Sequence, residues 1–220
     1  MQLGHESDKA NNVGDPGKTV FLVENDEAVR RSLKFQMEAM GYKVEAFESA
    51  LSFLDDYEPR EHSCLLLDVR MPGMNGIELQ QELKSRKDPV PVIMISGHAD
   101  VPAAVRAMKN GATDFLSKPV SGTELSEALE FALTTPMLAG RRCEVPVAEI
   151  RERMDHLTPR EGEVLTLVVD GHSSRQIAEK LAVSFKTIEA HRSKIMSKTK
   201  AQNVAHLVRM CLSEKVASAS

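Results

Sequence analysis

Short hydrophobic runs alternate with amphipathic stretches through the first 134 residues of the chain. Runs such as SCLLL are apolar at nearly every position, which is typical of strands buried on both faces of a parallel sheet. The five runs are TVFLV (19–23), KVEAF (43–47), SCLLL (63–67), PVIMI (91–95) and TDFL (113–116). Helices are predicted to begin near Glu27, Ser49, Asn75, Val101 and Thr123. This strand–helix repetition predicts an α/β fold, a doubly wound parallel sheet with helices on both faces.

Beyond residue 146 the pattern is wholly helical. Thr158, Pro159 and Glu161 form the signature of a helix start with a capping box. The expected helices cover residues 147–154, a segment beginning at 159, and residues 173–181, 185–197 and 202–211. The Ala-Val-Ser turn between the helices 173–181 and 185–197 is short, as in a helix-turn-helix.

The change of pattern divides the 220 residues into two domains, a number that this length readily accommodates. The segment TTPMLAGRRCEVP, with two prolines, a glycine and no periodicity, predicts a linker between them. The predicted organisation is a flexible leader (1–18), an α/β domain (19–134), a partly helical linker (135–155) and an all-α domain (156–220).

The net charge of −4 conceals a difference between the two domains. Residues 146–220 hold 12 basic and 9 acidic side chains, whereas residues 1–145 hold 16 basic and 23 acidic side chains. The basic excess is concentrated in residues 175–210, with 8 basic and 2 acidic side chains. A mildly acidic average argues against a nucleic-acid-binding protein, but the basic helical domain reverses that conclusion.

Composition and cysteine use narrow the class of protein further. A hydrophobic fraction of 42% supports packed cores and excludes general disorder. Cys64, Cys143 and Cys211 are far apart and share no metal-ligand spacing, which fits a reducing compartment. The polar amino terminus lacks the apolar region of a secretory signal, and no segment has the length of a membrane span. We therefore expect a cytoplasmic protein with no membrane partner.

Polar side chains follow the predicted strands at their carboxyl ends, where doubly wound sheets carry their chemistry. They are Glu24, Asn25 and Asp26 after the first strand, Asp68 after the third, Ser96 after the fourth and Lys118 after the fifth. Clustered carboxylates can hold Mg²⁺, which neutralises an incoming phosphoryl group together with a lysine. Asp68 is then the candidate nucleophile, because aspartyl phosphates are established covalent intermediates.

Three motifs in residues 19–134 resemble those of bacterial response-regulator receiver domains, which implies a flavodoxin-like (βα)5 fold. They are Leu67-Asp68-Val69-Arg70-Met71-Pro72-Gly73-Met74-Asn75-Gly76, Ile95-Ser96-Gly97-His98 and Phe115-Leu116-Ser117-Lys118-Pro119. The resemblance implies that Asp68 is the phospho-acceptor and that Ser96 and Lys118 contact the phosphoryl group. It further implies that Phe115 is the switch aromatic and that Glu24, Asp68 and the backbone carbonyl of Arg70 ligate Mg²⁺.

The segment Glu24-Asn25-Asp26, which follows the first predicted strand, departs from the family pattern. Asn25 stands where the family usually has a second acid that ligates the metal. Asn25 remains a candidate ligand through its neutral side-chain oxygen, but it brings no charge, so we expect weaker Mg²⁺ binding than in a standard receiver. Three hypotheses stay open: normal but weaker metal use, substitution by Asp26, or action that is partly independent of phosphorylation because repulsion around Asp68 is relieved.

The helix predicted at 185–197 is the candidate DNA-reading helix. Its residues outside the Ile188 and Ile195 stripe are Lys186, Thr187, Glu189, Ala190, His191, Arg192 and Lys194. Basic side chains there would bind phosphates, with an affinity that falls steeply as salt rises. Glu189 could accept a hydrogen bond from a cytosine amine.

The segments Leu157-Thr158-Pro159-Arg160-Glu161, Ile177-Ala178-Glu179-Lys180-Leu181 and Thr187-Ile188-Glu189-Ala190-His191-Arg192 resemble the LuxR-type helix-turn-helix domain. With the receiver, they place the chain near the FixJ/NarL class of transcriptional regulators, with an all-α four-helix DNA-binding domain. The resemblance implies a sensor histidine kinase, double-stranded promoter DNA and RNA polymerase as partners. It also implies a phosphorylated homodimer formed through the face that carries Val105 and Lys109.

Two other function classes are weaker. A phosphatase-type hydrolase that used Asp68 would need a second acid two residues later, where this chain has Arg70, so we do not expect an enzyme. A receiver that acts only as a protein-interaction module does not account for the basic residues at 175–210.

Overall fold

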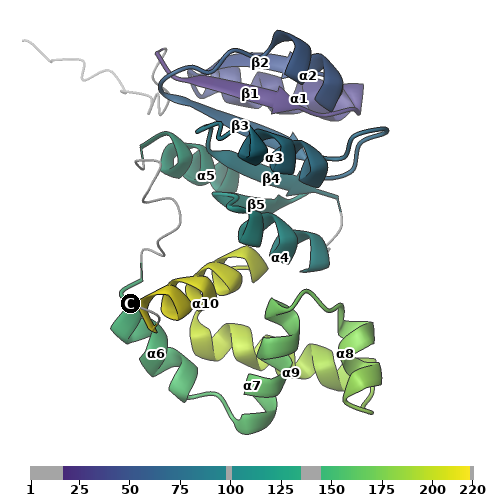
Figure 1. Cartoon of the computed structure of the whole chain (residues 1–220), viewed down its shortest axis with the longest axis vertical. Coiled ribbons are helices and arrows are strands. Elements are labelled where there is room, and N and C mark those ends of the chain that lie inside the picture. Colours follow the sequence, from purple (N-terminus) through teal and green to yellow (C-terminus); the bar gives the residue numbers. More distant parts are fainter. Residues whose placement is uncertain (1–16, 98–100, 135–144, 219–220) are drawn as a thin grey trace, which may run out of the picture.

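The computed structural model describes residues 17–97, 101–134 and 145–218, with side chains through residue 214. Residues 1–16 of the expected leader and residues 135–144 of the expected linker, together with His98 and Cys143, lie outside the described residues. The described chain forms an α/β domain and a helical domain that lie against each other (Figure 1). No helix in these ranges is both long and apolar enough to cross a bilayer.

The α/β domain contains a five-stranded parallel sheet with the strand order β2-β1-β3-β4-β5. The strands are β1 (Thr19–Val23), β2 (Lys43–Phe47), β3 (Ser63–Asp68), β4 (Val92–Ser96) and β5 (Asp114–Ser117). Every residue of β1, β3 and β4 is buried, which confirms the interpretation of their continuous apolar runs. The strand order reverses between β1 and β3, so the carboxyl ends of β1, β3 and β4 surround the switch point where such sheets bind ligands.

Helices cover both faces of the sheet, as the sequence predicts. They are α1 (Glu27–Ala39), α2 (Ala50–Asp56), α3 (Gly76–Ser85), α4 (Val101–Asn110) and α5 (Gly122–Thr134). One core joins α1 and α5 to one face, and a second core joins α2, α3 and α4 to the other. Ser49 and Asn75 each cap the helix that follows and form a capping box, which explains why the helix starts are predictable.

The helical domain consists of α6 (Val147–Asp155), α7 (Pro159–Val169), α8 (Ser174–Lys180), α9 (Phe185–Thr199) and α10 (Val204–Ser218). Thr158 and Glu161 form the predicted capping box at α7. The turn between α8 and α9 contains Ala182 in the left-handed region, with φ of 52°. Helix α10 continues well past the predicted end at residue 211, because Leu212 still packs against the core.

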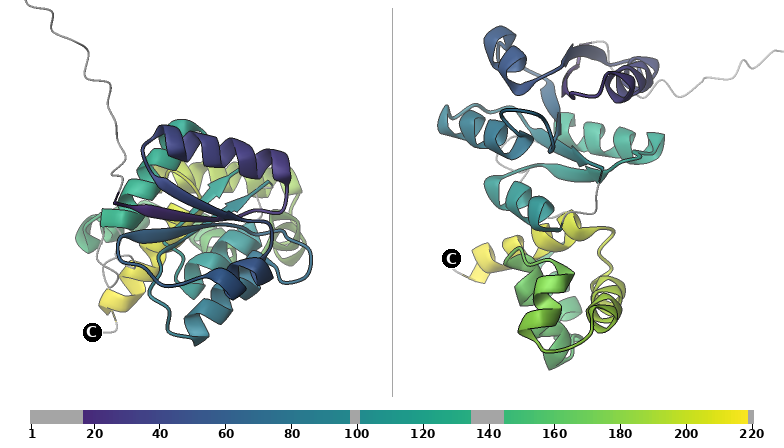
Figure 2. Two further views of the ribbon diagram at one scale, coloured as in Figure 1. Left: turned by 90° about the horizontal axis from the view of Figure 1, so that it is seen from above. Right: turned by 90° about the vertical axis from the view of Figure 1, so that its right-hand side faces the viewer.

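The two domains share an interface between α10, α7 and the α4 side of the sheet. Helix α10 lies against α4 and β5, and α7 also contacts α4 (Figures 1 and 2). One apolar cluster runs without interruption from α3 and α4 into α7, α9 and α10. The described conformation is therefore closed, with the helical domain covering one face of the α/β domain.

Candidate functional site

Three charged side chains from three strand ends meet at one edge of the sheet. Lys118 Nζ lies 2.5 Å from Glu24 Oε2 and 2.9 Å from Asp68 Oδ1. Glu24 and Asp68 are almost fully buried, with exposed fractions of 1% and 3%. The structure thus brings together the nucleophile, one acid and the lysine that the sequence predicts, because parallel strands end at the same edge.

The charge balance of this cluster favours a bound cation. Burial tends to lower the pKa of Lys118, but its hydrogen bonds with Glu24 and Asp68 outweigh burial and raise that pKa. The lysine therefore stays charged and contributes one positive charge. When both carboxyl groups are ionised, it leaves one buried negative charge uncompensated. Hard carboxylate oxygens with excess negative charge suit Mg²⁺.

The other side chains predicted as metal ligands, those of Asn25 and Asp26, lie at the surface rather than in the buried cluster. Asn25 and Asp26 are exposed, and Asp26 caps α1 by accepting a hydrogen bond from the Val29 N–H at 3.0 Å. Among the residues with described side chains, no three His, Cys, Asp or Glu side chains form a metal-binding group. The buried carboxylates of Glu24 and Asp68 could hold Mg²⁺, and the predicted neutral ligands are the Asn25 side chain and the Arg70 carbonyl.

The backbone around Glu24 has a support that the sequence analysis missed. Arg30 on α1 donates to the carbonyl oxygen of Glu24 at 2.7 Å and to that of Asn25 at 3.3 Å. The Glu24 side chain accepts a hydrogen bond from the Asp26 N–H at 3.0 Å. An arginine one turn into a helix carries no distinctive motif, so only the folded loop identifies its role.

The loop after Asp68 closes tightly on itself. A Cβ atom at Gly76 would lie 2.1 Å from the carbonyl oxygen of Asp68, closer than any nonbonded contact allows. The Gly76 N–H donates to the carbonyl oxygen of Val69 at 3.1 Å, and Gly73 has a positive φ of 72°. Glycine at position 76 is therefore required for α3 to start directly beneath the nucleophile.

Ser96 and Phe115 lie on the neighbouring strands β4 and β5. Ser96 is fully buried at the end of β4, and its carbonyl oxygen accepts a hydrogen bond from the Lys118 N–H at 2.7 Å. Phe115 is buried in the apolar cluster on the α4 side of the sheet. Ser96 thus ends the strand that pairs with the strand of Asp68, and Phe115 belongs to the apolar cluster that continues into the helical domain.

The residue before Phe115 is held by the helical domain. Arg209 of α10 donates to Asp114 Oδ1 at 3.0 Å and to the Thr113 carbonyl oxygen at 2.8 Å. Its guanidinium carbon also lies 5.4 Å from the centre of the Phe131 ring on α5. Burial raises the pKa of Asp114, although the charge of Arg209 opposes that shift. Sequence analysis missed this contact, which has no local motif.

The predicted dimer face lies partly beneath the helical domain. Val105 is 1% exposed, and its Cγ1 atom lies 3.8 Å from where a Cβ at Gly171 would be. Lys109 on the same helix is exposed. In the closed conformation a second copy could therefore reach Lys109 but not Val105.

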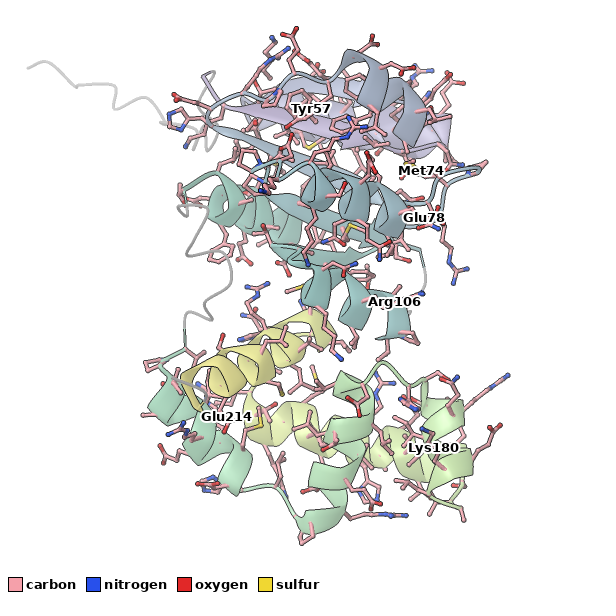
Figure 3. All side chains as sticks on the ribbon, viewed as in Figure 1. Tyr57, Met74, Glu78, Arg106, Lys180 and Glu214 are labelled. Atoms are coloured by element: carbon pink, nitrogen blue, oxygen red, sulfur yellow. The ribbon has the colours of Figure 1, made fainter. Side chains whose placement is uncertain are left out.

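Most of the predicted DNA-reading residues lie on α9 with their side chains exposed. Lys186, Glu189, Ala190 and Lys194 are exposed, while Ile188 and Ile195 are buried. Ser193 is also exposed, three residues after Ala190, and is a candidate contact that the sequence analysis missed. Lys180, at the end of α8, projects from the side of the helical domain opposite Glu214 (Figure 3).

The other three residues of α9 that were predicted to contact DNA are partly buried, and two of them form hydrogen bonds within the helical domain. The Thr187 hydroxyl contacts Ser184 Oγ at 2.7 Å, and His191 is half-buried. Arg192 donates to Ser174 Oγ at 2.7 Å and to Glu189 Oε1 at 2.9 Å. These contacts attach α9 to α8 and orient the Glu189 carboxylate.

The orientation of α9 also depends on α7. Lys198 Nζ lies 2.7 Å from the buried carboxylate of Glu161. The Lys198 hydrogen bond, followed by those from Thr158, lowers the pKa of Glu161 to about 2. Arg160 donates to the carbonyl oxygen of Leu181 at 3.1 Å, which supports the turn before α9.

Comparison with known proteins agrees with this architecture. Residues 20–130 match the family described as the response regulator receiver domain. Residues 155–211 match the family described as bacterial regulatory proteins, luxR family.

Relatives match over nearly the whole chain. The chain is 41% identical to the transcriptional regulatory protein FixJ of Azorhizobium caulinodans over 200 residues, which cover 91% of this chain and 94% of FixJ. It is 38% identical to the response regulator protein TodT of Pseudomonas putida over 209 residues, covering 94% of this chain and 88% of TodT. Among solved structures, the response regulator StyR is 39% identical, with a TM-score of 0.52, over 88% of this chain and 98% of StyR.

Proposed function

The chain belongs to the two-component response regulators that join a receiver domain to a LuxR-type DNA-binding domain, and we propose that phosphorylation of Asp68 controls its binding to promoter DNA. The family is one of transcriptional regulators rather than of enzymes. Membership implies a kinase that donates the phosphoryl group and a DNA target. We propose that this kinase is a sensor histidine kinase. Because the DNA target lies in the cytoplasm of a bacterium, we also propose that the protein acts there.

The contact of Lys118 with both Asp68 and Glu24 is the observation that carries the proposal. Asp68 Oδ1 lies 2.9 Å from the lysine, which can neutralise a phosphoryl oxygen once the phosphate is attached. The protein's contribution to phosphoryl transfer is positioning and charge stabilisation, and this cluster supplies both. When Mg²⁺ is bound, it neutralises further charge on the phosphoryl group.

Phosphorylation would change the charge balance next to Ser96. The added phosphoryl oxygens attract Lys118 and the Ser96 hydroxyl. Movement of Ser96 toward the phosphate would make room for Phe115 on the neighbouring strand β5, where Phe115 is two residues before the partner of Ser96. Because Asp114 directly precedes Phe115 and is bound to Arg209, the same movement would loosen the domain interface.

Release of the helical domain would then expose the predicted dimer face. Val105 is covered in the closed conformation, so pairing of two receivers through that residue requires opening first. Two paired copies would present two copies of α9 to half-sites about one duplex turn apart. A phosphoryl group that favours the open state shifts a pre-existing equilibrium, and no new fold is needed. The bound dimer would then act on RNA polymerase at the promoter.

One experiment tests the whole proposal. The purified full chain is incubated with a phosphodonor and Mg²⁺, and the same sample is measured for oligomeric state and for binding to duplex DNA at low and high salt. We expect incorporation of one phosphoryl group, its loss in Asp68→Asn, and salt-sensitive binding that strengthens with phosphorylation. Equal dimerisation and DNA binding by Asp68→Asn would favour the alternative, a regulator that acts largely without phosphorylation.

A further inference from the structure

The helical domain has one large hydrophobic side chain among its described residues that is half exposed to solvent, that of Phe185. Among the described residues, the exposed large hydrophobic side chains are Phe35, Leu51 and Phe185. Phe35 and Leu51 lie on α1 and α2 of the receiver. Phe185 is 51% exposed and is the first residue of α9, the proposed DNA-reading helix.

The position of Phe185 is well defined by its surroundings. Ser184 caps α9 and accepts a hydrogen bond from the Thr187 N–H at 3.0 Å. The core side of α9 is formed by Ile188, Ile195 and Thr199, all of which are buried, so this core is complete without half of the Phe185 ring. The ring is thus presented outward from a fixed helix end.

The neighbouring charges indicate what this surface binds. Helices α8 and α9 carry six basic side chains, namely Arg175, Lys180, Lys186, Arg192, Lys194 and Lys198. They carry two acidic side chains, Glu179 and Glu189. Arg192 pairs with Glu189 and Lys198 pairs with Glu161, but the other four basic side chains leave an excess of positive charge on these two helices. An apolar ring on a helix with excess positive charge matches a polyanion that also displays apolar groups. In the major groove of DNA those groups are the C5 methyl groups of thymine.

We propose that Phe185 contacts a thymine methyl group and so makes the regulator prefer a thymine at one position of each half-site. Phe185 and Glu189 are four residues apart and lie on one side of α9, separated by about 6 Å along its axis. Base pairs are stacked roughly 3.4 Å apart, so the thymine is one or two base pairs from the one that faces Glu189. This proposal rests on the proposed DNA-binding function and adds a sequence preference to it.

The test compares thymine with uracil, which differ only by the methyl group. A preferred duplex is selected from a random-sequence pool with the full chain in beryllofluoride and Mg²⁺. It is then resynthesised with deoxyuridine in place of one thymidine at a time. We expect one position per half-site at which the wild-type protein loses roughly fourfold in affinity, as burial of a single methyl group predicts.

The variant Phe185→Ala should bind the thymine duplex roughly fourfold more weakly per half-site and bind thymine and uracil equally at that position. Phe185→Leu should keep part of the preference, because an apolar side chain remains. Phe35→Ala removes an even more exposed phenylalanine from the receiver, 73% exposed against 51% for Phe185, and should behave as the wild type. Circular dichroism of each variant verifies that the helical domain stays folded.

Two outcomes would overturn the inference, and they differ from failure of the proposed function. If Phe185→Ala keeps the full preference for thymine, another side chain reads the methyl group. If the wild-type protein binds the selected duplex with no thymine position that discriminates, the ring faces a different partner. Failure to bind any duplex would overturn both proposals together.

Discussion

Arg209 on α10 binds Asp114, the residue directly before Phe115, across the boundary between the two domains. The guanidinium donates to Asp114 Oδ1 at 3.0 Å, and both side chains are mostly buried, with exposed fractions of 12% and 20%. Asp114 also accepts a hydrogen bond from the Phe115 N–H at 2.8 Å. One carboxylate therefore links the proposed switch aromatic to the DNA-binding domain.

Replacing Arg209 with alanine should favour the open arrangement. Loss of a mostly buried, charge-assisted hydrogen bond costs about 2 kcal/mol, which corresponds to roughly a thirtyfold shift toward opening. Hydrogen exchange of the α4 amides should accelerate, and the radius of gyration in solution should increase. Arg86→Ala is the matched control, because Arg86 caps the end of α3 and its side chain pairs with Glu82 of that helix, away from the domain interface. Unchanged exchange in α4 would contradict the linking role of Arg209.

Replacing Lys118 with methionine should destabilise the receiver in the absence of metal. Two buried carboxylates then face each other without a cation, and breaking such a pair costs about 3 kcal/mol. Mg²⁺ should restore more stability to this variant than to the wild type, because it replaces the missing positive charge. Urea unfolding with and without Mg²⁺ measures both effects, and Lys109→Met, at an exposed lysine, serves as the control. An equal Mg²⁺ effect in both proteins would argue against a cation site at Glu24 and Asp68.

Replacing Asn25 with aspartate should strengthen Mg²⁺ binding. The added carboxylate lies next to Glu24, and its attraction to a divalent cation should raise the affinity roughly tenfold. Calorimetric titration of Mg²⁺ measures the change. Gln81→Glu adds the same charge at an exposed position of α3 and should leave the affinity unchanged. If Asn25→Asp binds Mg²⁺ no better than the wild type, position 25 is not a ligand position.

Replacing Gly76 with alanine should disrupt the phosphorylation loop. The new Cβ would lie 2.1 Å from a backbone oxygen of Asp68, and relief of that overlap costs about 3 kcal/mol. Phosphoryl transfer to Asp68 should fall together with stability. Gly162→Ala is a control in open space within α7 and should stabilise the protein by up to about 1 kcal/mol. Thermal unfolding of both variants distinguishes the local clash from a general effect of alanine.

Replacing Glu161 with glutamine should make the stability of the helical domain less dependent on pH. The pKa of Glu161 is about 2 in the folded chain, below its ordinary value of 4.5. The stabilisation by the carboxylate is therefore complete above about pH 4.5 and is lost as the pH falls toward 2. Glutamine keeps the capping acceptor but loses the charge that binds Lys198.

Urea unfolding at pH 7 and pH 3 measures this dependence. The variant should be less stable than the wild type at pH 7, and the difference should shrink at pH 3. A difference that stays constant between the two pH values would assign the effect to packing rather than to the charge of Glu161.

Strands and helix starts were predictable because their signals are local. The run at residues 63–67 is apolar at nearly every position and so has no polar face. This distinguishes a strand buried on both sides from a strand with one face in solvent, which alternates apolar and polar residues. The start of α3 is equally local, because Asn75 and Glu78 form a capping box within four residues of the sequence. Strand order and the meeting of Asp68 with Lys118 follow from the rules for parallel sheets.

The direction of individual side chains on α9 was less predictable. Arg192 was expected outside the Ile188 and Ile195 stripe. It is four residues after Ile188 and three before Ile195, which places it on the packed side of the helix, and its side chain is 22% exposed and points to Ser174 on α8. Likewise, the resemblance to the receiver family implies a dimer face that carries Val105, whereas the helical domain covers this residue here. Periodicity identifies the apolar face of a helix but does not indicate which other element packs on it.

The sequence by itself determined two domains, the parallel sheet, the helix-turn-helix and the meeting of Glu24, Asp68 and Lys118 at one edge of the sheet. Each of these depends on short motifs or on repeated local patterns. The tertiary structure decided that the domains close on each other and that Arg209 reaches Asp114, 95 residues earlier in the chain. Such contacts depend on the fit of two distant surfaces, and neither surface carries a local signal of its partner.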